Sequence, residues 1–110
     1  MKVVYIAHPL GLGYDREQNR RRASRWVAWA ADRGVAPVAD WIILSGQWPE
    51  SRREQGLAID VTLVKRCDEL WLVGGRVSVG MQVEAEAARS AGIIVVDYTA
   101  LGEEPPATVK

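Results

Sequence analysis

The feature that most constrains the fold of this chain is a regular alternation between short apolar runs and longer amphipathic segments. The apolar runs have the length and β-branched content of buried strands, and they cover Val3–Ala7, Val35–Val38, Glu69–Val73 and Ile93–Asp97. The amphipathic segments show helical periodicity, and they cover Arg16–Arg33, Glu54–Cys67 and Gly80–Ala91. Alternating strands and helices predict an α/β fold: a doubly wound parallel sheet of four to five strands with helices on both faces, in a three-layer, flavodoxin-like or Rossmann-like arrangement.

Two stretches fall outside this pattern. Residues 39–53 lack sustained periodicity, so we expect a long loop there with at most one turn of helix. The end of the chain contains Glu103-Glu104-Pro105-Pro106, a sequence typical of poorly ordered segments. We therefore expect one domain over residues 1–101 and a flexible C-terminal tail over residues 102–110.

Composition excludes several classes of protein. The 110 residues include 14 Lys and Arg and 14 Asp and Glu, a balance that argues against nucleic-acid binding. The arginine run at 20–22 is interpreted as a solvated helix face. Cys67 is the single cysteine, so the chain alone forms neither a disulfide nor a cysteine-based zinc site. No apolar run approaches the roughly twenty residues of a membrane helix. We expect a cytoplasmic protein that binds neither nucleic acid nor membrane.

Two carboxylates fall on the apolar side of their expected helices. Glu84 lies near the middle of the apolar arc of the helix over 80–91, whereas its neighbour Glu86 lies on the polar arc. Asp60 lies among the apolar residues of the helix over 54–67. Burying an ionised carboxylate costs several kcal/mol unless it is paired, hydrogen-bonded or open to a ligand cavity. These positions leave two interpretations open: core acids satisfied by backbone N–H groups or by a partner such as Arg53, or two acids that share a pocket.

Their surroundings favour the pocket. In a parallel sheet, ligands bind beyond the carboxyl ends of the strands, where residues 8–14, residues 74–80 and the segment after Val38 would meet. Glu84 closely follows the expected helix start, where free N–H groups favour anions, and Gly80 would let a ligand approach the backbone. Tyr5 can direct its hydroxyl to the same crevice. Two carboxylates around a polar cavity are typical of glycosidic-bond chemistry, in which one attacks the anomeric carbon and the other handles protons or holds the sugar.

Over residues 3–97 the chain resembles the nucleoside 2-deoxyribosyltransferase-like superfamily, and within it a short, poorly characterised branch. The resemblance rests on six stretches of sequence: residues 4–10, Asn19 with Ala23, Gly34 followed by residues 36–38, residues 53–60, residues 67–71, and the most specific one, residues 78–84 with Ala87-Ala88.

The resemblance implies a role for each residue of the expected pocket. Glu84, six residues after Ser78 and four after Gly80, matches the nucleophile of the superfamily. Asp60 matches its sugar-binding aspartate, and Tyr5 matches its first-strand tyrosine. The implied reaction is attack of Glu84 on C1′ of a (deoxy)ribose, departure of the base, and resolution of the glycosyl-enzyme by water or a second base.

Ser78 indicates the kind of substrate. Members acting on free nucleosides typically carry aspartate there, whereas members that hydrolyse nucleoside 5′-monophosphates resemble this chain in having serine. Gly11 and a nearby arginine, Arg16 or Arg20, would suit a phosphate as well. No metal or organic cofactor is implied. We expect the substrate to be contacted by Ser78, Gly80, Met81, His8, Pro9, Gly11, Asn19, Trp41 and Arg53.

Two departures from the superfamily and one rival function remain. His8 replaces a common glycine, and residues 98–100 offer no clear equivalent of the residue that a neighbouring subunit often supplies. The resemblance nevertheless implies a homodimer or higher homo-oligomer, for which Trp29 facing a partner is the sequence hint. The alternative function is a non-catalytic nucleotide-binding or sensing module on the same fold. The base, the sugar, its 5′ group and the choice between hydrolysis and transfer stay open.

Overall fold

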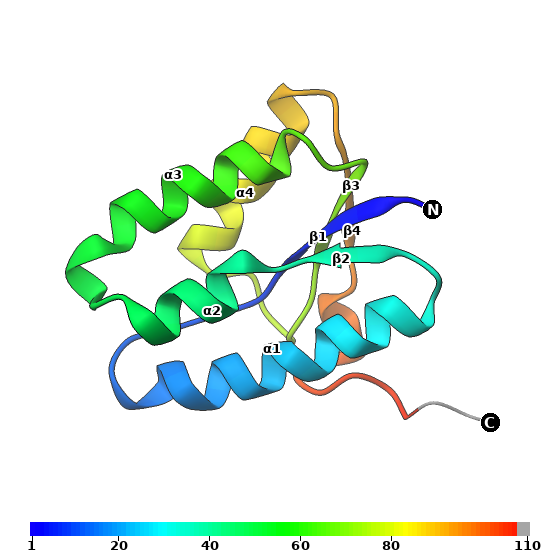
Figure 1. The fold of residues 1–110 in the computed structure, drawn as a ribbon. Coiled ribbons are helices and arrows are strands. Elements are labelled where there is room, and N and C mark those ends of the chain that lie inside the picture. Colours follow the sequence, from blue (N-terminus) through cyan, green and yellow to red (C-terminus); the bar gives the residue numbers. More distant parts are fainter. Residues whose placement is uncertain (108–110) are drawn as a thin grey trace.

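Four strands form a fully parallel sheet with the order β2-β1-β3-β4 in the computed structural model, which describes residues 1–107 (Figure 1). The strands are β1 (Val3–Ala7), β2 (Ala36–Val38), β3 (Glu69–Leu72) and β4 (Ile94–Asp97). Tyr5 in the central strand β1 is in register with Val38 of β2 and with Leu70 of β3. The predicted α/β fold with a doubly wound parallel sheet is confirmed, with four strands.

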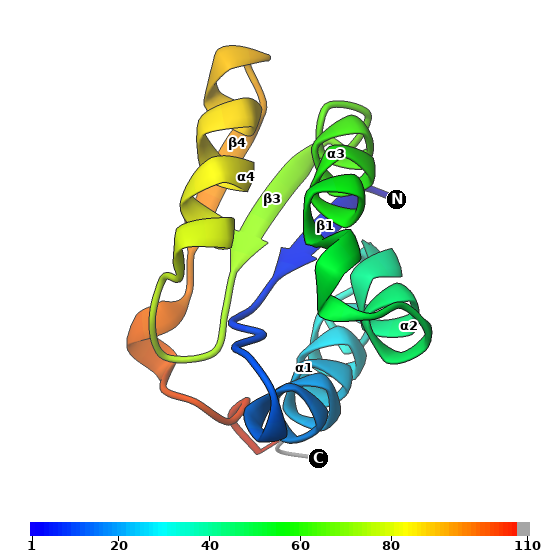
Figure 2. The same cartoon turned by 90° about the vertical axis from the view of Figure 1, so that its left-hand side faces the viewer.

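Helices cover both faces of this sheet because each central strand alternates its side chains between two apolar clusters. Val4 and Ile6 of β1 pack with Trp26 of α1 (Tyr14–Asp32) on one face. Tyr5 and Ala7 pack on the other face, against α3 (Arg53–Val64) and α4 (Val79–Ser90). Figure 2 shows α3 and α4 side by side on that face. The successive side chains of a strand point to opposite faces, so one short strand serves both layers.

Trp29 belongs to the core, not to a surface that faces a partner. Trp29 is only 6% exposed. Its ring makes edge-to-face contacts with Trp26, Trp71 and Tyr98, at distances between ring centroids of 5.1, 5.8 and 5.3 Å. Arg33 covers it, with the guanidinium carbon 4.0 Å from the ring centroid. The expectation for Trp29 was wrong because the apolar stripe of α1 is wide enough to bury both Trp26 and Trp29.

The segment expected to be a long loop contains a helix of eight residues, α2 (Asp40–Gln47), followed by a short 3-10 helix over Glu50–Arg52. The buried face of α2 is carried by Trp41, whose indole nitrogen donates to the Ile6 carbonyl at 3.0 Å. A helix with only two turns gives too few repeats for its periodicity to be recognised. Its existence matters because it forms one wall of the site described below.

Residues 102–107 run along α1 after the 3-10 turn Thr99–Leu101. The Trp26 indole nitrogen donates to the Glu103 carbonyl at 2.9 Å, and Arg25 forms an ion pair with Glu104. The first part of the expected flexible tail is thus held against the domain, and residues 108–110 lie outside the described residues. None of the described helices combines the length and apolar character that crossing a membrane requires.

Candidate active site

A pocket of about 490 Å³ opens at the carboxyl ends of the central strands β1 and β3. The strand order changes direction between these two strands, and ligands of parallel sheets commonly bind at such a switch point. The three segments expected to surround one crevice all contribute to it: the loop after β1, the α2 segment after β2, and the loop that leads into α4. The start and inner face of α3 complete the wall. Figure 2 shows the ends of β1 and β3 pointing toward this region.

Glu84 and Asp60 both line this pocket, from α4 and α3 respectively. Glu84 is 6% exposed and Asp60 is 9% exposed, whereas Glu86 on the same helix as Glu84 is exposed. The inward positions predicted from helical periodicity are confirmed. Neither acid forms an ion pair with a basic side chain among residues 1–107, so the expected alternative of pairing with Arg53 is not observed.

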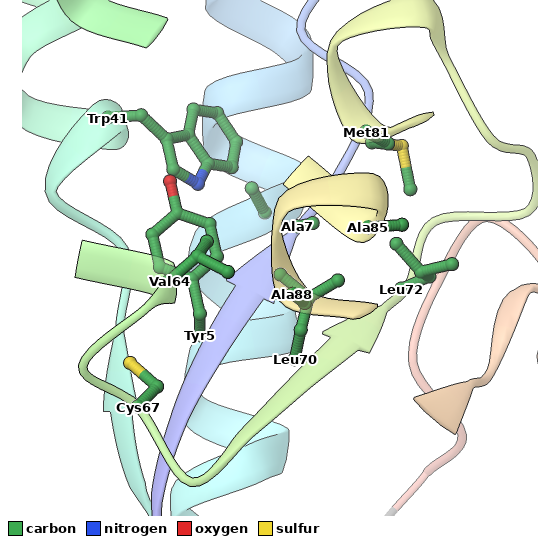
Figure 3. Packing of buried hydrophobic residues seen from close by; sticks show 11 residues of the cluster. Tyr5, Ala7, Trp41, Val64, Cys67, Leu70, Leu72, Met81, Ala85 and Ala88 are labelled. Carbon is green, nitrogen blue, oxygen red and sulfur yellow. The ribbon is translucent and has the colours of Figure 1, made fainter. Parts of the chain in front are cut away.

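Tyr5 lies behind these two acids and is not part of the pocket wall. It is fully buried in the core cluster that contains Trp41 and Val64 (Figure 3), and its hydroxyl has no hydrogen-bond partner. Burial raises the pKa of the Tyr5 hydroxyl above its ordinary value, and the nearby charges of Glu84 and Asp60 raise it further. The phenol therefore stays protonated, and its O–H group can donate a hydrogen bond to a carboxylate.

Asp40 is an acidic residue beside this pocket, outside its lining, that was not expected from the sequence. It is the first residue of α2 and follows β2 after a single residue, so it also lies at the carboxyl end of the sheet. Both of its carboxyl oxygens are buried without hydrogen-bond partners, as is Oδ1 of Asp60. Its position two residues after the strand end Val38 is the signal that could have found it.

The concentration of acids without cations changes their protonation. Burial raises the pKa of Glu84 to about 7; the Tyr5 hydroxyl opposes this shift and the charge of Asp40 adds to it. Burial also raises the pKa of Asp60, and Glu84 and Asp40 raise it further. Among residues 1–107 no group of three or more His, Cys, Asp or Glu side chains has the geometry of a metal site. Because the pKa of Glu84 is about 7 and that of Asp60 is raised, these two acids are partly protonated at neutral pH.

The mouth of the pocket has the opposite character, with four arginines in its lining: Arg16, Arg52, Arg53 and Arg76. Arg16 is held in place because its guanidinium donates to the Ser45 carbonyl at 2.8 Å and lies 3.7 Å from Glu50. The Arg52 guanidinium stacks on Trp48, 3.6 Å from the ring centroid. The other arginine expected as a phosphate ligand, Arg20, is not in the lining and pairs with Glu17 and the Ile42 carbonyl.

The start of α4 brings backbone N–H groups to the same pocket. Ser78 is the N-cap residue, and its hydroxyl oxygen accepts from the Met81 N–H at 3.3 Å while its own O–H stays available for a ligand. Gly80 lies one residue inside the helix; a Cβ atom there would be 3.7 Å from the Arg53 guanidinium. Ser78, Gly80 and Met81 all line the pocket, as does Gly11 across from them in the loop after β1.

His8 lies in this wall as a neutral imidazole. Burial lowers its pKa to about 4, and Nδ1 is 2.6 Å from the Pro9 carbonyl oxygen. Gly74 lies directly against it, because a Cβ atom on Gly74 would be 2.5 Å from His8 Cδ2. Gly74 also has a φ of +100°, which only glycine adopts readily. The loop that leaves β3 is thus fitted closely to the loop that leaves β1.

Two residues expected to contact the substrate, Pro9 and Asn19, do not line this pocket. They face a smaller hollow of about 180 Å³ on the far side of the loop after β1. The Asn19 side-chain amide donates to the Leu10 carbonyl at 2.8 Å, so it fixes the conformation of that loop. The loop after β1 separates the two hollows, so His8 and Gly11 line the larger one while Pro9 and Asn19 line the smaller one.

Comparison with known proteins identifies a domain family without indicating an activity. One domain family matches residues 2–98, and it is described as a domain of unknown function, DUF7768. No curated protein matches the chain significantly.

Proposed function

Because the chain belongs to the DUF7768 family, whose activity is unknown, its function must be inferred from its own residues, and we propose that it breaks the N-glycosidic bond of a (deoxy)nucleoside or nucleoside 5′-monophosphate. The observation that carries this proposal is the position of Glu84: a buried carboxyl group, without an ionic partner among residues 1–107, in the wall of a pocket beside a second acid. A cavity of about 490 Å³ is large enough for a nucleotide-sized ligand.

The proposed reaction begins with the ionised form of Glu84. Its carboxylate oxygen attacks C1′, the C1′–N bond breaks, and the bonding electron pair leaves with the base, which takes a proton from Asp60. Water then adds to C1′ and gives a proton to Asp60, while the bond between Glu84 and C1′ breaks. Two displacements at C1′ retain its configuration. A second base in place of water gives transfer, so hydrolysis and transfer share the first step.

The charge distribution along the pocket supports a 5′-monophosphate over a free nucleoside. The inner end is acidic and rich in protons, which suits hydroxyl groups and ring nitrogens, whereas the mouth carries Arg53, Arg76 and the N-terminal N–H groups of α4. Trp48, held under Arg52, offers an aromatic face for a base at the same mouth. We propose small nucleotides as the partners of this pocket, with homodimer formation as a separate proposal from the family resemblance.

The test is release of free base from a panel of nucleosides and 5′-monophosphates, followed by chromatography, with and without an acceptor base. We expect release by the wild type and a loss of about 10³-fold or more in Glu84→Gln. Glu86→Gln, an exposed glutamate on the same helix, is the matched control and should retain full activity. Release that survives in Glu84→Gln would reject Glu84 as the nucleophile.

One observation favours a second candidate, a non-catalytic nucleotide-binding or sensing module. With its pKa at about 7, Glu84 is partly protonated at neutral pH, and a protonated carboxyl group does not attack C1′. Saturable binding of a monophosphate, with no base released at any pH from 6 to 9, would favour the sensor.

A further inference from the structure

The Asp40 carboxyl group is buried close to Asp60, and Asp60 lines the pocket whereas Asp40 does not. We propose that Asp40 is a positioning residue that holds a proton on the Asp60 carboxyl group, so that Asp60 faces the pocket as a neutral hydrogen-bond donor. This inference deepens the proposed function and rests on it only for what Asp60 does to a ligand.

Asp40 and Asp60 form no ion pair among residues 1–107, and the Tyr5 hydroxyl near them is a single donor that also faces Glu84. Both oxygens of Asp40 and Oδ1 of Asp60 are buried without a hydrogen-bond partner. Two ionised carboxylates have only acceptors to offer each other, so a hydrogen bond between them requires a proton on one. A single shared proton satisfies one oxygen of each residue, which removes most of the cost of burying them.

Charged and titratable groups from several elements surround the pair. Tyr5 of β1 and Glu84 of α4 face it, and the Cys67 thiol before β3 is close enough for the charge of Asp40 to help raise its pKa. Two arginines of α1 hydrogen-bond to α2, and both have other partners: Arg16 binds the Ser45 carbonyl and lies near Glu50, and Arg20 binds the Ile42 carbonyl and Glu17. Among residues 1–107 none of the groups around the pair supplies a positive charge through an ion pair, so retention of a proton is the remaining way to reduce repulsion.

The position of each acid in its helix indicates which of the two carries the proton. Asp40 is the first residue of α2, where the helix dipole favours a negative charge. Asp60 is the eighth residue of α3, away from the N-terminus of that helix, and is close enough to Glu84 to be affected by its charge. Burial raises the pKa of Asp60, and the nearby charges of Glu84 and Asp40 raise it further, in agreement with this assignment. The negative charge thus lies on Asp40 outside the pocket lining, and the proton lies on Asp60 in the wall.

The test is a ¹³C NMR titration of aspartate carboxyl groups in the ligand-free protein, with Asp60→Asn used to assign the Asp60 resonance. We expect one aspartate to stay protonated at pH 7 in the wild type and to be absent from Asp60→Asn. In Asp40→Asn the Asp60 resonance should titrate lower by about one pH unit or more, because the amide has no negative charge and can donate to an ionised Asp60. Asp32→Asn, an exposed aspartate at the end of α1, is the matched control and should leave the titration unchanged.

Two results would overturn the proposal. One is a wild-type titration in which no aspartate carboxyl group stays protonated at pH 7, a result that needs no variant. The other is an Asp60 titration that is the same in a folded Asp40→Asn protein as in the wild type. Neither measurement involves substrate, so a missing glycosidase activity with the proton present, or the reverse, separates this inference from the proposed function.

Discussion

The His8 imidazole stacks on the Trp41 indole, with ring centroids 6.3 Å apart and ring planes inclined by 16°. This contact joins the loop after β1 to α2 and forms a continuous part of the pocket wall. The buried stack also explains why His8 is neutral, since burial is the largest cause of its lowered pKa. His8 therefore supports the shape of the pocket and does not supply a positive charge to it.

The first prediction concerns the pH dependence that His8 gives to stability. Its pKa is about 4 in the folded protein and has the ordinary value of 6.5 in the unfolded chain, so the unfolded state binds its proton first as the pH falls. Relative to His8→Gln, the wild type should lose stability as the pH falls from about 6.5 to about 4. Urea unfolding of both proteins at a series of pH values measures this difference. A difference that is constant with pH would mean that His8 is solvated.

The second prediction concerns Glu84 and has the opposite sign. Its folded pKa of about 7 lies above the ordinary 4.5, so the unfolded state loses its proton first as the pH rises. As the pH rises from about 4.5 to about 7, the free energy of unfolding of Glu84→Gln should increase relative to that of the wild type, by about 3 kcal/mol in total. The same unfolding series on Glu86→Gln should show no such trend. If Glu84→Gln also shows none, Glu84 is exposed to water and its proposed role is lost.

Two of the three buried carboxyl groups of this site were predicted from the sequence, and the third was not. Glu84 and Asp60 lie on helices with three turns, long enough for apolar periodicity to show which side is buried, and both predictions were confirmed. Asp40 begins a two-turn helix whose pattern is too short to detect. The position of Trp29 was wrong for a related reason: periodicity shows which face of a helix is apolar, but the aromatic cluster that fills the space under it is formed by distant residues, Trp71 and Tyr98.

The third prediction separates the two ends of the pocket. Arg53→Ala should weaken binding of a nucleoside 5′-monophosphate by about 10-fold to 100-fold, because a guanidinium contact to phosphate is charge-assisted. Binding of the matching free nucleoside should be nearly unchanged, and Arg66→Ala, exposed beyond the end of α3, is the matched control. Isothermal titration calorimetry measures both ligands. Equal losses for nucleoside and monophosphate would place the phosphate elsewhere.

The fourth prediction tests the role of Trp29. Trp29→Ala removes a buried ring that contacts three other aromatic rings, so it should lower the free energy of unfolding by about 3–5 kcal/mol. Sedimentation of the folded variant should show the same oligomeric state as the wild type, because the side chain is not available to a partner. A change in assembly without a loss of stability would contradict this assignment.

One buried group each from β1, α2, α3 and α4 meets at the inner side of the pocket: Asp60 and Glu84 belong to its lining, and Tyr5 and Asp40 lie outside the lining. Consecutive members of this set are separated by 20 to 35 residues of chain, and α4 is the last α-helix to be synthesised among the described residues. A nascent polypeptide therefore presents no assembled acidic centre until α4 has left the ribosome and docked.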